Sequence, residues 1–472
     1  MPTRRTLKKI SALAGLSASL IAASLLASTT SVSTARAADA PKLEIPFTQF
    51  TLPNGLNVIL SEDHTVPIVS VNIIVKVGSR FEADRRSGFA HLFEHLMFMG
   101  TDRVPTGQYD AWMEGDGGWN NAWTSEDRTD YYDVGPAHEL PLLLYLEADR
   151  LDALGKTMTA EKLEAQRKVV RNERRQRSEN EPYAKVELRM PELLYPEGHP
   201  YHHPVIGSHE DLEAAQVKDV QEFFATYYVP SNLSLVVAGD FEPTETKALI
   251  EKYFGILEGG KTPPPPPSAP PAKLTKVVRE TILDAVEFPK VVMAFHSPAR
   301  FQPGDAELDI LAEVLVEGKS SRLYKTLVYD KELAQSVSAR QSSQDLSSYF
   351  TIEALARPNV KPEELEAAID AELAKIVKDP VAPEELERAK NAFETNFVRR
   401  LESTEARASL LNSYMTFLGD PGSIQRDLDR YRGVSRDSLF STTSSVLKLD
   451  QRVVIYVVPN PEEPAEKSGG SK

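Results

Sequence analysis

The sequence contains no cysteine among its 472 residues. This absence excludes disulfide bonds, thiolate metal sites, cysteine nucleophiles and a cysteine-linked lipid anchor. Any bound metal ion must therefore be held by histidine and carboxylate side chains. Histidine is itself scarce, with 9 residues, so two histidines at a ligand spacing carry information.

Basic residues are outnumbered, with 54 Lys and Arg against 69 Asp and Glu and a formal net charge of −15. An acidic chain is a poor binder of phosphate backbones, so we expect no nucleic-acid partner. Hydrophobic residues make up 41% and charged residues 26%, which is typical of folded globular domains. The composition excludes a disordered chain and a multi-span membrane protein.

Residues 1–37 have the pattern of a bacterial-type signal peptide. Basic residues at positions 4, 5, 8 and 9 precede an apolar run at 10–27, and small residues follow up to Ala35-Arg36-Ala37. We expect export to the periplasm and cleavage, which leaves no stable membrane anchor. The Arg4-Arg5 pair does not decide between Sec and Tat export.

A proline-rich linker at residues 259–272 divides the remaining chain. It separates a domain at 41–258 from a related domain at 273–460. Each domain ends in a predicted helix followed by an apolar strand, at 217–228 and 231–238 and again at 434–447 and 452–458. The fold class is therefore α+β, with two divergent copies of one unit. The tail at 461–472 has no apolar face and is predicted to be disordered.

The first domain begins with strands. Residues 47–60 predict a hairpin around Pro53-Asn54-Gly55, and residues 66–77 predict a buried strand. A helix from about Ser87 to Met99 follows.

His91, Glu94 and His95 share one arc of that helix. Two imidazoles one turn apart can bind one metal ion, and a carboxylate beside them can reach metal-bound water. Zinc lowers the pKa of such water, so Glu94 can act as a general base in hydrolysis. The alternative is that the histidines are structural and their spacing is accidental. A second cluster, His199, His202 and His203, lies in a Pro-flanked loop that offers no fixed ligand geometry.

The segment His91-Leu92-Phe93-Glu94-His95 resembles the inverted motif of the pitrilysin/insulinase family of zinc metallopeptidases. The flanking residues resemble that family as well: Gly78-Ser79, Glu82, Gly88, Asn121-Ala122-Trp123-Thr124 and Tyr131-Tyr132. The similarity extends over most of the mature chain and is that of a two-domain, bacterial processing-peptidase-like member. It implies a mixed sheet flanked by helices in each half, together forming half of a clamshell, and one Zn²⁺ per chain.

The resemblance also implies a third ligand, Glu173 in the segment VVRNERRQ. By itself, the charged helical stretch at 160–179 would be assigned to a solvated surface. Glu164 and Glu179 are poorer candidates, because each is displaced by more than one and a half helical turns. Many members carry an acidic residue two turns before the ligand, where this chain has Gln166. Any role of charge at that position is therefore in doubt.

Asn121 and Ala122 lie in a predicted strand that follows two glycines. Such a strand at a sheet edge can pair with an extended peptide. The resemblance implies that these two residues hold the substrate beside zinc. An ordinary structural strand is the alternative.

The second domain contains Gly318-Lys319-Ser320, which is not a phosphate-binding loop because Glu313 replaces its first glycine. Arg322 and Tyr329, seven residues apart, are predicted to share one face of a helix. The resemblance implies that Arg322 holds substrate and Tyr329 steadies the oxyanion. It also implies that two chains complete a chamber, as a homodimer or as a heterodimer with a related subunit. Whether the pair acts in its own chain's site or in the partner's stays open.

These observations predict an exported zinc metalloendopeptidase that cuts peptides or unfolded segments inside a dimeric chamber. Two alternatives remain: a non-catalytic assembly subunit with the same fold, and a zinc hydrolase of non-peptide substrates. The intact motif argues against the first, and the second depends on whether the strand edge is open.

Overall fold

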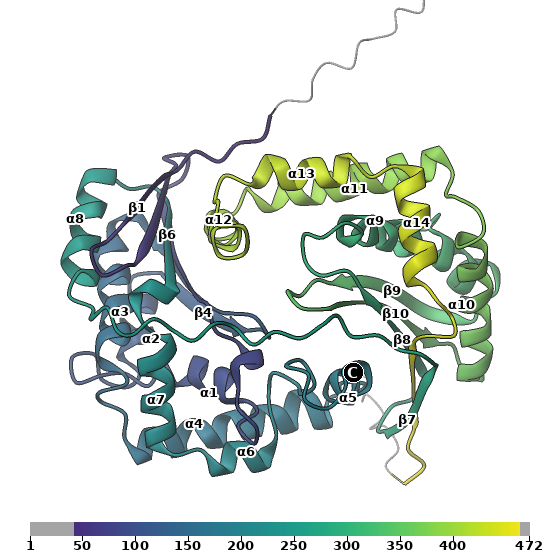
Figure 1. Cartoon of the computed structure of the whole chain (residues 1–472), viewed down its shortest axis with the longest axis horizontal. Coiled ribbons are helices and arrows are strands. Elements are labelled where there is room, and N and C mark those ends of the chain that lie inside the picture. Colours follow the sequence, from purple (N-terminus) through teal and green to yellow (C-terminus); the bar gives the residue numbers. More distant parts are fainter. Residues whose placement is uncertain (1–41, 463–472) are drawn as a thin grey trace, which may run out of the picture. The chain divides into compact units, whose positions relative to one another are not determined.

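The structure is a computed structural model that describes residues 42–462. The predicted signal peptide at 1–37 lies outside the described residues, as does the predicted tail from residue 463 onward. Among the described helices, none is long and apolar enough to cross a membrane. From Glu44 to the end of the described range, the chain forms one compact unit with two separate sheets (Figure 1).

The first half forms a six-stranded mixed sheet. Its strands are β1 (Thr48–Thr51), β2 (Asn57–Glu62), β3 (Ile68–Val75), β4 (Trp119–Thr124), β5 (Thr129–Pro136) and β6 (Leu233–Gly239). Their order is β1-β2-β6-β3-β5-β4, with β2 and β6 parallel and the other neighbours antiparallel. The predicted hairpin is β1 and β2, and the predicted buried strand is β3.

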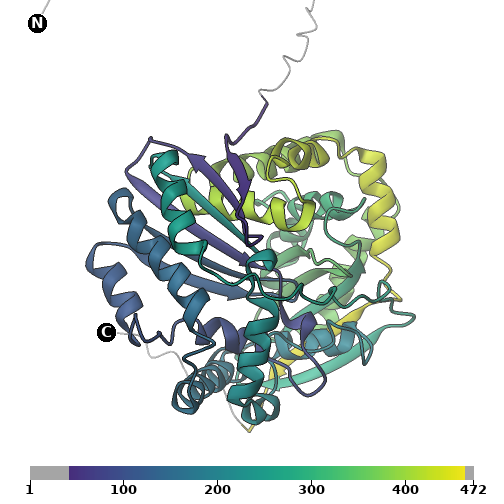
Figure 2. The same ribbon diagram turned by 60° about the vertical axis from the view of Figure 1, so that its left-hand side comes forward.

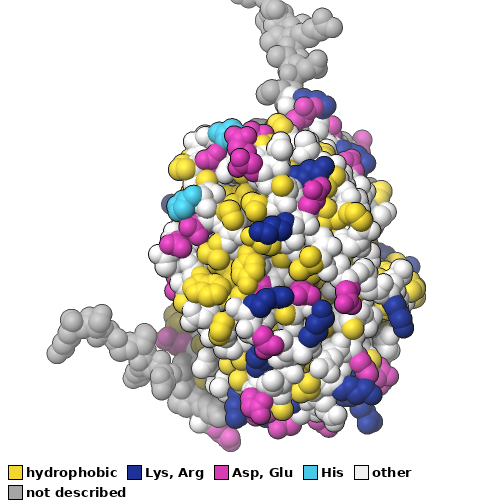
Figure 3. Space-filling view, turned by 90° about the vertical axis from the view of Figure 1, so that its left-hand side faces the viewer, with side chains coloured by type: hydrophobic (Ala, Val, Ile, Leu, Met, Phe, Trp, Pro, Cys, Tyr) yellow, Lys and Arg dark blue, Asp and Glu magenta, His cyan; other side chains and the backbone are white. Residues whose placement is uncertain are grey.

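One face of this sheet carries the main core. Residues 69, 71, 73 and 75 of β3 belong to it, as expected when alternate side chains face the same way. The helices that contribute to this core are α1 (Phe89–Leu96), α2 (Gln108–Gly115), α3 (Leu140–Ala153), α4 (Ala160–Glu173), α6 (His209–Ala214), α7 (Val217–Tyr227) and α8 (Pro243–Phe254). On the face where α8 lies in Figure 1, acidic and basic side chains are interspersed among apolar ones (Figure 3).

The second half forms a five-stranded mixed sheet. Its strands are β7 (Val278–Asp284), β8 (Lys290–Ser297), β9 (Ala334–Ser342), β10 (Ser348–Ala356) and β11 (Val453–Pro459), in the order β7-β11-β8-β10-β9. Only β7 and β11 are parallel. The core on one face is completed by α9 (Asp305–Val316), α10 (Pro362–Ile376), α11 (Pro383–Arg400) and α14 (Arg436–Val446), while α13 (Ile424–Arg432) packs on α9 and α11. The α+β fold class with two mixed sheets flanked by helices is confirmed. The predicted helix and strand are present in both halves, as α7 and β6 and as α14 and β11, but the first half continues after β6 with α8, which was not predicted.

Each half also covers the second face of the other half's sheet with one helix. From the second half, α12 (Thr404–Leu418) packs Ala408 and Leu411 against β2 and β6 of the first sheet. Figures 1 and 2 show α12, in yellow-green, beside the purple strands. From the first half, α5 (Lys185–Leu194) packs Val186 and Met190 against β8 and β11. The halves are thus joined by exchanged helices as well as by the linker at 259–272. The domain limits 41–258 and 273–460 stay a prediction.

Asn412 is expected to be important for this exchange. It is fully buried in α12, and its Nδ2 donates to Asn72 Oδ1 in β3 at 2.6 Å and to the Ser234 carbonyl in β6 at 2.9 Å. Asn412→Ala leaves both acceptors buried without this donor, so we expect a loss of about 1–3 kcal/mol in the free energy of unfolding. Urea denaturation measures this loss. The exposed Asn391→Ala in α11 is the control, and equal midpoints for both variants would contradict the expectation.

Candidate metal centre

Helix α1 presents its polar side chains opposite the core. Leu92, Phe93 and Leu96 are fully buried in the core of the first half. His91 and His95 lie on the other side, with side chains 12% and 22% exposed and ring centroids 4.7 Å apart. The helix spans Phe89–Leu96, which is shorter at both ends than predicted.

The N-terminus of α1 is held by a buried carboxylate. Gly88 precedes the helix at φ 85° and offers no side-chain cap. Instead, Glu82 accepts hydrogen bonds from the backbone N–H groups of Gly88 at 2.9 Å and Ala90 at 2.7 Å. Gly207 packs so closely that a Cβ atom there would lie 2.3 Å from Gly88 Cα. These contacts fix the start of α1, and therefore the direction of His91 in its first turn.

Glu173, the last residue of α4, approaches both imidazoles. Its Oε2 lies 3.1 Å from His95 Nε2 and 3.8 Å from His91 Nε2. Ligand atoms about 2.0–2.2 Å from a tetrahedral zinc ion lie roughly 3.3–3.6 Å from one another. Both observed distances are within a few tenths of an ångström of this range, and the donor set of two histidines and one glutamate is one that zinc uses. These residues fit a zinc ion.

The protonation states favour metal binding. Burial, together with the proximity of His95, lowers the pKa of His91 to about 4. The hydrogen bond with His95 lowers the pKa of Glu173. Neutral imidazole and ionised carboxylate are the forms that coordinate a metal ion.

Glu94 is buried beside this cluster, with 8% of its surface exposed. His91, Glu94 and His95 form a group of potential ligand residues whose ligand atoms all lie within 4.8 Å of one another. Thr124 in β4 donates its hydroxyl to Glu94 Oε2. Burial raises the pKa of Glu94 to about 7, whereas a nearby cation would favour its charged form. The carboxylate is thus held in one orientation by β4.

Strand β4 is the outermost strand of the first sheet, so one of its edges is free of strand pairing. Its predicted substrate residues, Asn121 and Ala122, line the same cavity as His91 and Glu94. The Ala122 backbone N–H donates to Asn121 Oδ1 at 2.9 Å and is thus turned away from β5. The free edge therefore carries a backbone donor, the Ala122 N–H, which is hydrogen-bonded to the Asn121 side chain in this structure.

The cavity has a volume of about 900 Å³ and is lined by both halves of the chain. Sequence reasoning missed several lining residues because no motif marks them: Glu126, Arg177, Glu187, Arg340, Tyr349 and Glu353. Arg177 lies in a π-helical turn that continues α4 at Arg174–Asn180 and pairs with Glu173 Oε1 at 2.7 Å. This turn replaces the later part of the α-helix predicted at 160–179.

Comparison with known proteins assigns the family. Residues 57–200 match the family model described as Insulinase (Peptidase family M16), and residues 214–393 match the model described as Peptidase M16 inactive domain. The zinc protease PqqE of Helicobacter pylori is 32% identical over 406 residues, which cover 84% of this chain and 88% of that protein. The chain belongs to the pitrilysin/insulinase family, peptidase family M16.

Other members extend the comparison. The uncharacterized zinc protease YmxG of Bacillus subtilis is 27% identical over 396 residues, covering 82% of this chain and 94% of that protein. A protease from Helicobacter pylori of known crystal structure shares 29% sequence identity with this chain. The two structures superpose with a TM-score of 0.82, and the match covers 88% of this chain and 100% of that one. A peptidase M16 inactive domain from Pseudomonas fluorescens, 18% identical with a TM-score of 0.77, matches 89% of this chain and 99% of that one and shows the shared fold.

The family resemblance assigned roles to two residues of the second half, Arg322 and Tyr329. Neither of them lines the cavity. Arg322 forms a two-pronged ion pair with Glu385 in α11, at 2.9 and 2.7 Å, and Tyr329 is 73% exposed. The expectation that they share one face of an α-helix is wrong, because residues Tyr324–Asp330 form a π-helical turn. Seven residues complete two α-helical turns but fall short of two of the wider π turns.

The loop histidines make structural contacts. The His199 ring stacks on Tyr195 with centroids 4.7 Å apart, and His202 Nδ1 lies 2.8 Å from the Tyr195 carbonyl. His203 Nδ1 lies 3.6 Å from Glu82 Oε2, beside the carboxylate that holds α1. In the described part of the chain, none of the three belongs to a potential metal group.

Glu173→Gln is expected to weaken zinc binding by more than about 100-fold, because loss of even an outer partner costs about 10–100-fold. Competition with a chromophoric chelator measures the affinity. Glu179→Gln is the matched control, since that carboxylate pairs with Arg174 and His209 instead. Equal zinc affinities for the two variants would rule out Glu173 as a ligand.

Proposed function

We propose that this member of the family is an exported zinc metalloendopeptidase that hydrolyses peptides or unfolded segments. The observation that carries the proposal is the convergence of His91 Nε2, His95 Nε2 and Glu173 Oε2 beside Glu94 and a free strand edge. The names of relatives as zinc proteases support it. Export to the periplasm rests on the sequence of residues 1–37.

In this proposal His91, His95 and Glu173 hold one Zn²⁺. When bound, zinc polarises the scissile carbonyl and makes water acidic enough to attack near neutral pH. Glu94 accepts the proton of the attacking water, and the hydroxyl of Thr124 keeps its carboxylate oriented. The surrounding cavity leaves Glu94 only 8% exposed, which excludes most bulk water from the base.

The peptide lies along β4 as an added strand. The Ala122 N–H donates to a carbonyl of the peptide once the Asn121 side chain moves aside. Backbone pairing recognises an extended chain rather than a particular sequence. The free edge beside the metal ligands therefore favours peptides over the alternative of non-peptide substrates.

The non-catalytic subunit is the second alternative. The model described as an inactive domain matches residues 214–393, which lie outside the segment that carries the potential ligands. The first half matches the peptidase model and retains both histidines, Glu94 and Glu173. This division of the two models supports a catalytic first half and a supporting second half in one chain.

Two chains form the chamber, as a homodimer or as a heterodimer with a related subunit. Tyr329 supports this arrangement, because it is 73% exposed and lies apart from its own chain's cavity lining. A phenol at the surface of one chain can donate to the oxyanion in the site of the partner. Arg322 holds substrate in the same arrangement once it leaves Glu385.

Glu94→Gln tests the mechanism. The amide keeps the shape of the side chain but accepts no proton, so we expect cleavage of a fluorogenic peptide of about twenty residues to fall about 10²–10⁴-fold. Zinc content, measured in parallel, should be unchanged. If the purified mutant cleaves as fast as the wild type, Glu94 is not the base.

Mixing tests the dimer. Tyr329→Phe alone should lose about 10²-fold or more in kcat if its hydroxyl donates to the oxyanion. If the donor comes from the partner, an equal mixture of Glu94→Gln and Tyr329→Phe chains re-assorts into dimers of which half are mixed, each with one intact site. About a quarter of wild-type activity then returns in a homodimer. The absence of recovery after verified subunit exchange would place Tyr329 in its own chain's site or outside catalysis.

A further inference from the structure

The turn between β4 and β5, residues 125–128, lies next to the proposed general base. Thr124, which donates to Glu94, directly precedes this turn, and Glu126 lines the cavity. Any displacement of the turn therefore moves the hydrogen-bond donor of Glu94. The orientation of the base depends on what holds the turn in place.

The segment before α1 holds one side of the turn. The Ser79 N–H donates to the Ser125 carbonyl at 3.1 Å, and the Arg80 N–H donates to the Glu126 carbonyl at 3.0 Å. Gly78 lies so close that a Cβ atom there would be 2.3 Å from the Ser125 carbonyl oxygen. This side of the turn is made within the first half of the chain.

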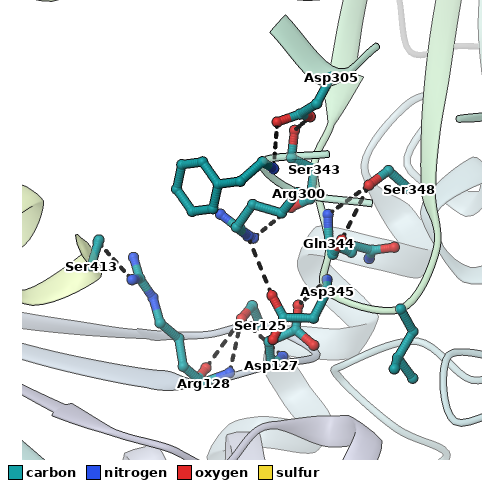
Figure 4. A network of polar contacts seen from close by, with 12 residues as sticks. Ser125, Asp127, Arg128, Arg300, Asp305, Ser343, Gln344, Asp345, Ser348 and Ser413 are labelled. Carbon is teal, nitrogen blue, oxygen red and sulfur yellow. Dashed lines mark hydrogen bonds and ion pairs between the residues drawn. The ribbon is translucent and has the colours of Figure 1, made fainter. Parts of the chain in front are cut away.

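The second half of the chain holds the other side through Asp127. Figure 4 shows Asp127 beside Asp345, which lies in the loop between β9 and β10. The backbone N–H of Asp345 donates to Asp127 Oδ2 at 3.1 Å. Tyr201 donates its hydroxyl to Asp127 Oδ1 at 2.6 Å, and Arg80 Nη1 lies 2.9 Å from the same oxygen. The Asp127 side chain is only 1% exposed.

Both oxygens of Asp127 face donors, and this makes the carboxylate hard to replace. An asparagine has the same shape but turns one acceptor into an N–H₂ group. One orientation places that group against the Asp345 N–H, and the other places it against the Tyr201 hydroxyl and the Arg80 guanidinium. Either way, two buried donors meet and the link to one neighbour is lost.

We propose that Asp127 is a positioning residue of the peptidase site, through which the loop of the second half fixes the turn that holds Thr124 against Glu94. This inference rests on the proposed function. It assigns the second half a part in catalysis although that half supplies no metal ligand. The loop at Asp345 keeps the turn at 125–128 in position beside Glu94.

Asp127→Asn tests this role. We expect kcat for the twenty-residue peptide to fall about 10–100-fold, because small misplacements of a catalytic group have effects of this size, with KM and zinc content unchanged. Glu366→Gln is the matched control. Glu366 is also a buried carboxylate paired with a tyrosine hydroxyl and arginines, here Tyr456, Arg279 and Arg452, but it lies within the second half. Its loss should lower thermal stability to a similar extent and leave kcat unchanged.

A double-mutant cycle tests the route. If Asp127 acts through Thr124, then Thr124→Val should lower kcat by a similar factor, and Asp127→Asn should add little in its presence. Independent, multiplicative effects would overturn the proposal, as would equal kcat values for Asp127→Asn and Glu366→Gln. If Asp127→Asn does not fold, Tyr201→Phe removes one donor to the same carboxylate and carries the same expectation in milder form.

Hydrogen exchange separates this inference from the proposed function. Asp127→Asn should accelerate exchange of the backbone amides at 124–128, and Glu366→Gln should not. If the wild-type chain cleaves no peptide but exchange changes as expected, the proposed function fails while the link between the halves stands. Unchanged exchange in Asp127→Asn would overturn the link itself, whatever the activity.

Discussion

The burial of Glu82 beneath the first turn of α1 is the contact on which the candidate metal centre depends. A helix N-terminus has backbone N–H groups without partners, and Gly88 has no side chain to accept them. The carboxyl group of Glu82 accepts hydrogen bonds from two of these groups within the core, where burial raises its pKa well above the ordinary value. Because the start of the helix is fixed, helical geometry also fixes the direction of His91 in the first turn.

The reciprocal packing of α5 and α12 joins the two halves through shared hydrophobic clusters. Each half covers one face of its own sheet with its own helices. The other face is covered by one helix from the opposite half, α12 on the first sheet and α5 on the second. The cavity depends on this exchange, because α5 forms part of its wall between the metal cluster and the second sheet. The second half shapes the site through lining residues such as Arg340 and Tyr349, and none of its described residues belongs to the potential metal group.

Local signals predicted much of this architecture. The hairpin, the buried strand and the helix-strand pair present in each half follow from turn residues and apolar periodicity, which are properties of neighbouring residues. His91, Glu94 and His95 could be found for the same reason, since one helical turn separates them. Glu173 could be assigned only through the family resemblance, because its charged helix reads as a solvent-exposed face.

The features that sequence reasoning missed depend on distant parts of the chain. The contact of Asp127 with Asp345 joins residues 218 positions apart, and no periodicity predicts it. The helix exchange was missed because an apolar helix face does not specify which sheet it covers. The π-helical turns after Glu173 and around Tyr329 have the composition of ordinary helices, so the predicted α-helical spacing failed there.

The side chain of Asn121 protects the free edge of β4 when no other strand is paired with it. An unpaired edge is a template on which other chains can aggregate. By occupying the Ala122 N–H, the Asn121 amide imitates the carbonyl of a missing strand and lowers the gain from any casual pairing. In the proposed function, a peptide bound at this edge would exchange one hydrogen bond for another at this position. The Asn121 amide would then also favour release of the shortened products of the proposed cleavage, because they make fewer backbone hydrogen bonds to the strand.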